Sequence, residues 1–171
     1  MVQVMYLGVE GVLFENRPTN VRFQRPQLGT LHLKPLPLLT TISRLIAGQP
    51  DLSVVLNSRL IADYGYRSII NMLPEPIARN TIGATIPGNR VHRRDATTSR
   101  ADLLRADIRR RCPNHLVIVD ASSYAIPYEY LPMAVHVNTV HPRATAAFAD
   151  RILNLLYATA EMNDSETGLS A

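Results

Sequence analysis

Residues 2–14, VQVMYLGVEGVLF, are the stretch from which the fold of this chain is inferred. The stretch opens with a short apolar run, Val2–Leu7, and then reaches Gly8 and Gly11, two residues that interrupt regular structure. A short, continuous apolar run that ends at glycine is typical of a strand buried on both faces. We therefore predict a buried strand over Val2–Leu7 that runs into a tight turn, with Glu10 as the charged residue in that turn.

Similar apolar runs recur along the chain and alternate with segments that have helical spacing. The strands that we predict after the first are Leu52–Leu56, a short one at Thr81–Ile86, Leu116–Val119 and Ala134–Val137. The helices that we predict are Leu36–Ala47, Arg59–Met72, one that starts after Ser99, and Arg143–Ala160. Ser99 followed three residues later by Asp102 resembles a capping box, which marks a helix start.

The alternation of continuous apolar strands with helices predicts an α/β fold. We expect a Rossmann-like three-layer sandwich, with a central, mostly parallel sheet and helices on both faces. Residues 1–160 are expected to form one domain, which the size of the chain allows. Within it the polar residues 15–34 are expected to form a flap-like insertion, and residues 161–171 a flexible tail.

Composition excludes several classes of protein. Hydrophobic residues make up 46% of the chain, too many for a disordered protein, yet no apolar run reaches the length of a membrane helix. We therefore expect no membrane association. Cys112 is the only cysteine, so no intrachain disulfide can form, and a cytoplasmic location is the expectation.

The positive charge is unevenly distributed and consists almost entirely of arginine. The net charge is +4, and Lys34 is the only lysine. Arg90–Arg111 contains eight Arg and three Asp, which makes this region a candidate for nucleic-acid binding. The run Arg109–Arg111 lacks interleaved aromatic residues, so it is also read as a solvated helix end. Codon preference is an equally simple reason for the abundance of arginine.

Three tyrosines follow the Leu116–Val119 strand within a few residues of one another. They are Tyr124, Tyr128 and Tyr130, in SSYAIPYEYLP. Tyrosine rings can stack on a base or on a protein partner, and they also occur in ordinary loop packing beside proline. Both readings stay open at the level of sequence.

Polar residues follow three of the predicted strands, at Gly8–Glu10, Asn57–Ser58 and Asp120–Ser123. In parallel α/β sheets, ligands bind beyond the carboxyl ends of the strands. These three strand ends are therefore predicted to meet at one edge of the sheet and to form the functional site.

These strand ends, in this order, resemble the haloacid dehalogenase (HAD) superfamily of phosphohydrolases. The closest resemblance is to small bacterial HAD-type domains that occur alone or within RNA-repair proteins, and it implies little or no cap domain. The family's first motif, Asp-x-Asp-Gly-Val-Leu, corresponds to GVEGVL here, so that Gly8 and Glu10 take the two acidic positions. Ser58 in VVLNS corresponds to the second motif, and Asp120 in VIVDAS to the fourth.

The resemblance also implies a role for each of these positions. In the family the first Asp attacks phosphorus, the second acts as acid and base, and the fourth motif helps to bind Mg²⁺. Gly8 removes the nucleophile, and Ala121 replaces a second metal-site acid. Glu10 is left as a candidate residual acid/base. The candidate metal ligands are Glu10 and Asp120, and the candidate ligand-binding residues are Gly8, Gly11, Ser58, Arg100 and, as a second choice for the basic third motif, Arg94.

Loss of the nucleophile makes a non-catalytic domain the leading hypothesis, because removal of a covalent nucleophile typically lowers the rate by orders of magnitude. Such a domain would regulate or bind, with a protein as the expected partner and phosphate or a nucleotide as possible ligands. No cofactor is expected, although a degenerate site could retain Mg²⁺. A first alternative is a metal-dependent phosphohydrolase that uses Glu10 and Asp120. A second is a nucleic-acid-binding module that uses Arg90–Arg111.

Overall fold

A five-stranded, wholly parallel sheet forms the centre of the computed structural model, which describes residues 3–16, 33–86, 98–137 and 142–166. Its strands lie in the order β3-β2-β1-β4-β5, so that the first strand of the chain is also the central one. Their bounds are Gln3–Leu7 for β1, Leu52–Leu56 for β2, Thr81–Ala84 for β3, His115–Asp120 for β4 and Ala134–His136 for β5. All five predicted strands are confirmed, with ends that differ by two residues at most.

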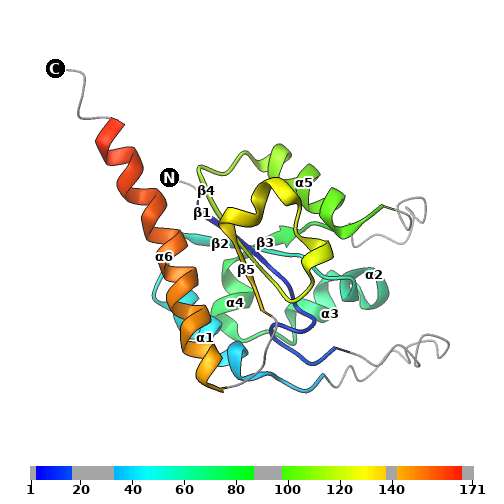
Figure 1. Cartoon of the computed structure of the whole chain (residues 1–171). Coiled ribbons are helices and arrows are strands. Elements are labelled where there is room, and N and C mark those ends of the chain that lie inside the picture. The colour runs from blue at the N-terminus through cyan, green and yellow to red at the C-terminus, as the bar shows by residue number, and fades with distance from the viewer. Residues whose placement is uncertain (1–2, 17–32, 87–97, 138–141, 167–171) are drawn as a thin grey trace.

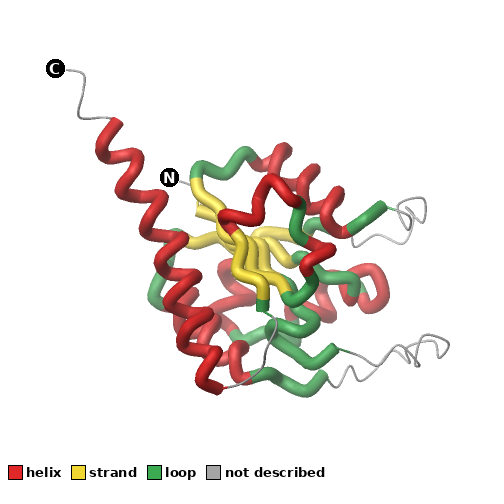
Figure 2. Tube along the Cα trace, in the orientation of Figure 1, coloured by secondary structure: helices red, strands yellow, loops and turns green. Residues whose placement is uncertain are grey.

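Helices cover both faces of this sheet, as Figures 1 and 2 show. Side chains alternate along β1: Met5 and Leu7 point into the larger core, and Val4 and Tyr6 point into a smaller core on the opposite face. The larger core receives buried side chains from α1 (Pro37–Ala47), α2 (Leu60–Tyr64), α3 (Tyr66–Ile70), α4 (Glu75–Asn80) and α6 (Pro142–Glu166). The smaller core is covered by α5 (Arg100–Arg111). The predicted three-layer α/β sandwich is thereby confirmed.

The predicted start of α5 is also confirmed. Ser99 caps the helix, because its Oγ accepts a hydrogen bond from the Asp102 backbone N–H at 3.1 Å. The helix that this cap begins places Arg100 in its first turn, facing the carboxyl ends of the strands.

The prediction of one helix over Arg59–Met72 was wrong. Gly65 divides this segment into α2 and α3, because its backbone adopts φ 86°, a left-handed conformation that ends a helix. Helix α4 was not predicted; it begins at Glu75, directly after Pro74.

The connection from β4 to β5 is built from two short 3₁₀ turns, η3 (Ser123–Ala125) and η4 (Tyr128–Met133). The last helix, α6, continues to Glu166, six residues beyond the predicted end at Ala160. Most of the predicted flap, 15–34, and the last residues of the predicted tail lie outside the described residues. Within the described part of the chain, no helix has the length and apolar character needed to cross a bilayer.

Candidate functional site

Three strand ends meet at the carboxyl edge of the sheet because the parallel hydrogen bonding continues past the strands. The backbone N–H of Gly8 donates to the Val119 carbonyl at 2.7 Å, and the N–H of Asn57 donates to the Leu7 carbonyl at 2.8 Å. Gly8 and Asn57 are thereby brought next to Asp120, the last residue of β4. The convergence predicted from the sequence is present. We call the group Gly8, Glu10, Asn57, Arg100 and Asp120 the strand-end site.

Asp120 lies at the centre of a buried polar network. Its Oδ2 accepts hydrogen bonds from Arg100 Nη2 at 2.6 Å and from Asn57 Nδ2 at 3.2 Å. Its Oδ1 accepts one from the backbone N–H of Ser122 at 2.9 Å. Arg100 also donates to the carbonyl of Asn57, whose side-chain oxygen accepts from Thr85 Oγ1 at 2.8 Å. Both carboxylate oxygens of Asp120 are therefore held by the protein itself.

Burial raises the pKa of Asp120 from 3.8 to about 6. Its side chain is fully buried, and removal from water penalises the charged form of a carboxyl group. The positive charge of Arg100 opposes this shift, whereas the negative charge of Glu10 adds to it. Because Arg100 is only 11% exposed, the two groups form a buried ion pair, and each depends on the other for compensation.

Gly8 leaves no room for a side chain in this arrangement. A Cβ atom built on Gly8 would lie 2.8 Å from Asp120 Oδ2 and 3.2 Å from the Val119 carbonyl oxygen. The first distance is shorter than any ordinary contact of a Cβ atom. The carboxylate of Asp120 thus occupies the space in which a nucleophile at position 8 would begin.

Glu10 and Ser58 are both directed to the start of α2. Oε1 of Glu10 and Oγ of Ser58 each accept a hydrogen bond from the backbone N–H of Leu60, at 3.2 Å in both cases. These bonds satisfy a donor that is free at a helix start, which is a structural task. The second oxygen of Glu10 is buried and has no hydrogen-bond partner among the described residues.

Gly11 is required by the turn after β1. Its φ of 76° is left-handed, and a Cβ there would meet the Cβ of Ala121 at 2.6 Å. The backbone N–H of Gly11 donates to the Phe14 carbonyl at 2.7 Å, which closes the turn. Ala121, in the position of a second family acid, thus packs directly against this turn.

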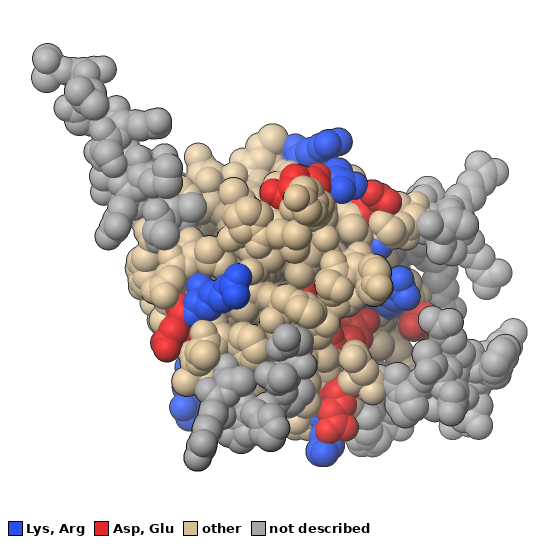
Figure 3. Space-filling model, viewed as in Figure 1, with Lys and Arg blue, Asp and Glu red and all other residues tan. Residues whose placement is uncertain are grey.

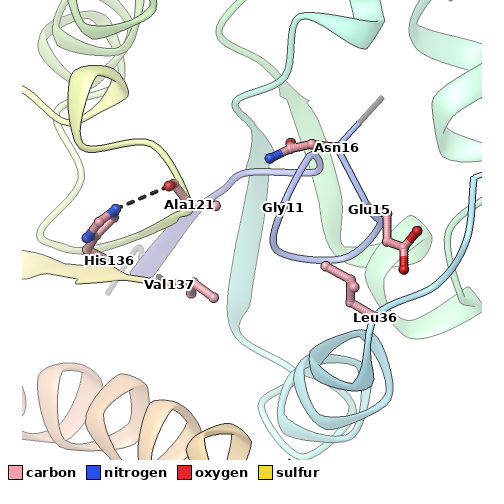
Figure 4. Close-up of a pocket in the computed structure, with 7 residues that line it drawn as sticks. All are labelled: Gly11, Glu15, Asn16, Leu36, Ala121, His136 and Val137. Carbon is pink, nitrogen blue, oxygen red and sulfur yellow. Dashed lines mark hydrogen bonds between the residues drawn. The ribbon is translucent and has the colours of Figure 1, made fainter. Parts of the chain in front are cut away.

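A hollow of about 330 Å³ opens beside the site, at the ends of β1, β4 and β5. Figure 4 shows its lining, with Asn16 and Glu15 on one side and His136 on the other. His136 Nε2 lies 3.1 Å from the carbonyl oxygen of Ala121. Glu15 makes an ion pair with Lys34 at 2.8 Å. Among the described residues, the lining contains no Lys or Arg side chain that could bind a phosphate group.

The strand-end site does not fit a divalent metal. Mg²⁺ needs several oxygen ligands in near-octahedral geometry, whereas the described residues contain no group of three or more acidic, His or Cys side chains that could hold an ion. Both oxygens of Asp120 already accept hydrogen bonds, as does one oxygen of Glu10. We therefore derive no chemical step through Mg²⁺ at this site.

The candidate residues of the sequence fall into three groups. Gly8, Arg100 and Asp120 meet in the buried network, Glu10 and Ser58 meet at the start of α2, and Gly11 forms the adjacent turn. Arg94 lies outside the described residues. Sequence reasoning placed Asn57 at this edge but gave it no role, and it missed Thr85; both residues are buried. Asn57 directly follows a strand, and its position beside Ser58 was the available signal.

The comparisons with known proteins point to one family. Residues 4–142 match the family described as "HAD domain in Swiss Army Knife RNA repair proteins". No curated protein and no solved structure matched the chain.

Proposed function

Since the chain belongs to the family of HAD domains found in Swiss Army Knife RNA repair proteins, we propose that it is a non-catalytic member that works by binding. It would act in the cytoplasm as a regulatory or recruiting domain, in the RNA-repair setting that the family's description names. Two features of the strand-end site, the position of Asp120 and the balance of charges, support the absence of phosphoryl transfer.

The observation that carries this proposal is the position of the Asp120 carboxylate. It fills the space beside Gly8 from which the family's nucleophile would attack, and Arg100 holds it there. A covalent route needs an attacking group, and this site offers none at that position. The buried network thus replaces a reactive group with an internal ion pair.

The charges of the site favour the same conclusion. A phosphoryl group brings negative charge and needs cations or free hydrogen-bond donors to compensate for it. Arg100 is the cation at this site among the described residues, and its guanidinium already bonds to Asp120 and to the carbonyl of Asn57. Glu10 adds a further negative charge nearby.

Turnover of phosphomonoesters and nucleotides with Mg²⁺ tests the proposal, with native protein beside Glu10→Ala and Asp120→Asn. We expect the same rate for all three proteins, at the level of the buffer or of a shared trace contaminant. Turnover in the native protein that disappears in both variants would contradict the proposal and establish a metal-dependent hydrolase.

A further inference from the structure

The connection from β4 to β5 exposes aromatic rings to an unusual degree. Tyr124 is 91% exposed and Tyr128 is 85% exposed, whereas Tyr130 packs against the smaller core. Leu131 and Met133, in the same connection, are 43% and 39% exposed. Large apolar side chains that project from a folded surface in one short segment mark a surface for binding.

This segment is held in place although its tyrosines project. Ala125 and Ile126, between the two exposed tyrosines, are buried in the protein. Arg105 on α5 anchors the far end through Glu129: its Nε donates to Oε1 at 2.5 Å, and its Nη2 donates to Oε2 at 3.2 Å. A partner that uses these rings would therefore not have to order the segment, which favours affinity.

In the fold, the basic helix α5 lies beside the segment that carries these tyrosines, although the two are separated in the sequence. Helix α5 packs against η3, and the Arg105–Glu129 ion pair joins it to η4. Arg109 lies one helical turn beyond Arg105 and is exposed. Its guanidinium makes no ion pair or hydrogen bond with the described residues, although its charge, after that of Arg105, helps to lower the pKa of the Glu129 carboxyl. Arg110 is 66% exposed while it pairs with Asp107. Figure 3 shows basic and acidic side chains side by side at the top of the molecule, with further charged side chains at the left, at the right and in the lower part of the same face.

We propose that this surface, Tyr124, Tyr128 and Arg109, binds single-stranded nucleic acid. Exposed aromatic rings stack on unpaired bases, and a neighbouring guanidinium contacts the phosphate backbone. In the sequence, no aromatic residue is interleaved with the Arg109–Arg111 run. In the fold, Tyr124 and Tyr128 of the connection from β4 to β5 supply the aromatic rings. The inference extends the proposed function by naming the class of partner, and it holds whether or not the strand-end site has turnover.

The balance of charges predicts how this binding depends on salt. Arg105 is neutralised by Asp102 and Glu129, with which it forms ion pairs at 2.5 Å. Among the described residues, few free cations therefore remain at this surface, Arg109 foremost. The logarithm of the affinity falls by about 0.7 per neutralised phosphate for each tenfold rise in salt. We expect a shallow slope of about −1, so that stacking, and not charge, carries most of the affinity.

Fluorescence anisotropy with a labelled single-stranded RNA of about 12 nucleotides tests the proposal on the full chain. Replacing each tyrosine by Ala should weaken binding about fivefold or more, and Tyr124→Ala/Tyr128→Ala about 25-fold. The double Phe variant keeps both rings and should bind as the native protein does. Tyr157→Ala, which removes a 53% exposed tyrosine on α6, is the matched control and should bind normally.

The charged contact is tested separately from the rings. Arg109→Gln should weaken binding a few-fold and flatten the salt slope, whereas Arg67→Gln, a change at an exposed arginine on α3, should do neither. A hairpin duplex should compete at least tenfold less well than the single strand, because its bases are already stacked.

If the native protein binds the RNA, three results would still overturn the proposal. The first is native-like RNA binding by the double Ala variant. The second is a double Phe variant that loses as much RNA binding as the double Ala variant does. The third is a hairpin duplex that competes as well as the single strand. No measurable binding of RNA by the native protein would overturn it as well, and would point to a protein partner for these tyrosines. None of these outcomes depends on phosphatase turnover, so the two proposals can fail separately.

Discussion

The proposed loss of chemistry depends on Gly8, and restoring the family's Asp there should not restore activity. A side chain at position 8 starts 2.8 Å from the Asp120 carboxylate, so Gly8→Asp brings a second negative charge beside a buried one. We expect the free energy of unfolding to fall by about 2–4 kcal/mol, without a gain of Mg²⁺-dependent turnover. Urea denaturation and a phosphatase assay on the same preparation measure both quantities.

Gly8→Ala is the control that separates crowding from charge. It introduces the same Cβ atom without a carboxylate, and the crowding of Asp120 should lower the free energy of unfolding by about 1–2 kcal/mol. An Asp variant as stable as the Ala variant would show that Asp120 moves aside at no electrostatic cost. Turnover in Gly8→Asp would show that the site needs only its nucleophile.

Asp120 gives the protein a pH dependence of definite sign. Because burial raises its pKa from 3.8 to about 6, the folded state binds the proton more tightly than the unfolded state does. The stability that this group contributes is complete below about pH 4 and is lost as the pH rises through about 6. A shift of about two pKa units corresponds to about 3 kcal/mol.

Urea denaturation between pH 4 and 7.5 tests this sign, with native protein beside Asp120→Asn. The free energy of unfolding of the native protein, relative to that of the variant, should fall by about 2–3 kcal/mol over this range. All other groups are common to both proteins, so the difference between the two curves isolates Asp120. Parallel curves for the two proteins would mean that Asp120 keeps an ordinary pKa.

At the scale of one element, we expect the ion pair between Arg100 of α5 and Asp120 of the sheet to stabilise the fold more than the cap of α5 does. Arg100→Gln leaves Asp120 buried without its counter-charge and should lower the free energy of unfolding at pH 7 by about 3 kcal/mol. Ser99→Ala removes only the hydrogen bond from Asp102 N–H and should lower it by about 1 kcal/mol. Urea denaturation of both variants tests this ranking. Equal losses of the free energy of unfolding in the two variants would contradict it.

The elements differ in how well their sequence predicted them. Strand β1 and its turn were predicted because an apolar run that ends at glycine has few alternative structures. The break at Gly65 was missed because the apolar spacing continues across it, and only the backbone conformation of the glycine reveals the end of α2. The network was predicted in part: Arg100 and Asp120 were named separately, but their pairing depends on side-chain directions that no spacing specifies.

For the molecule as a whole, β1 joins the two cores into one unit. Met5 and Leu7 belong to the larger core, and Val4 and Tyr6 to the smaller one, so neither face can lose its packing without disturbing the same strand. The strand-end site lies at the end of that strand. The rigidity of the site and the stability of the fold should therefore be lost together, in one cooperative transition.

Two matched core variants test this cooperativity. Ile42→Ala opens a space under α1 in the larger core, and Leu104→Ala opens one under α5 in the smaller core; both side chains are fully buried. Each change should lower the free energy of unfolding by about 2–5 kcal/mol. Far-UV circular dichroism and tyrosine fluorescence should follow one coincident transition in both variants, since the chain has no Trp and Tyr6 lies in the shared strand. If Leu104→Ala instead showed an early fluorescence change while the dichroism persisted, α5 would unfold as a separate unit, and the ion pair between Arg100 and Asp120 would not couple it to the sheet.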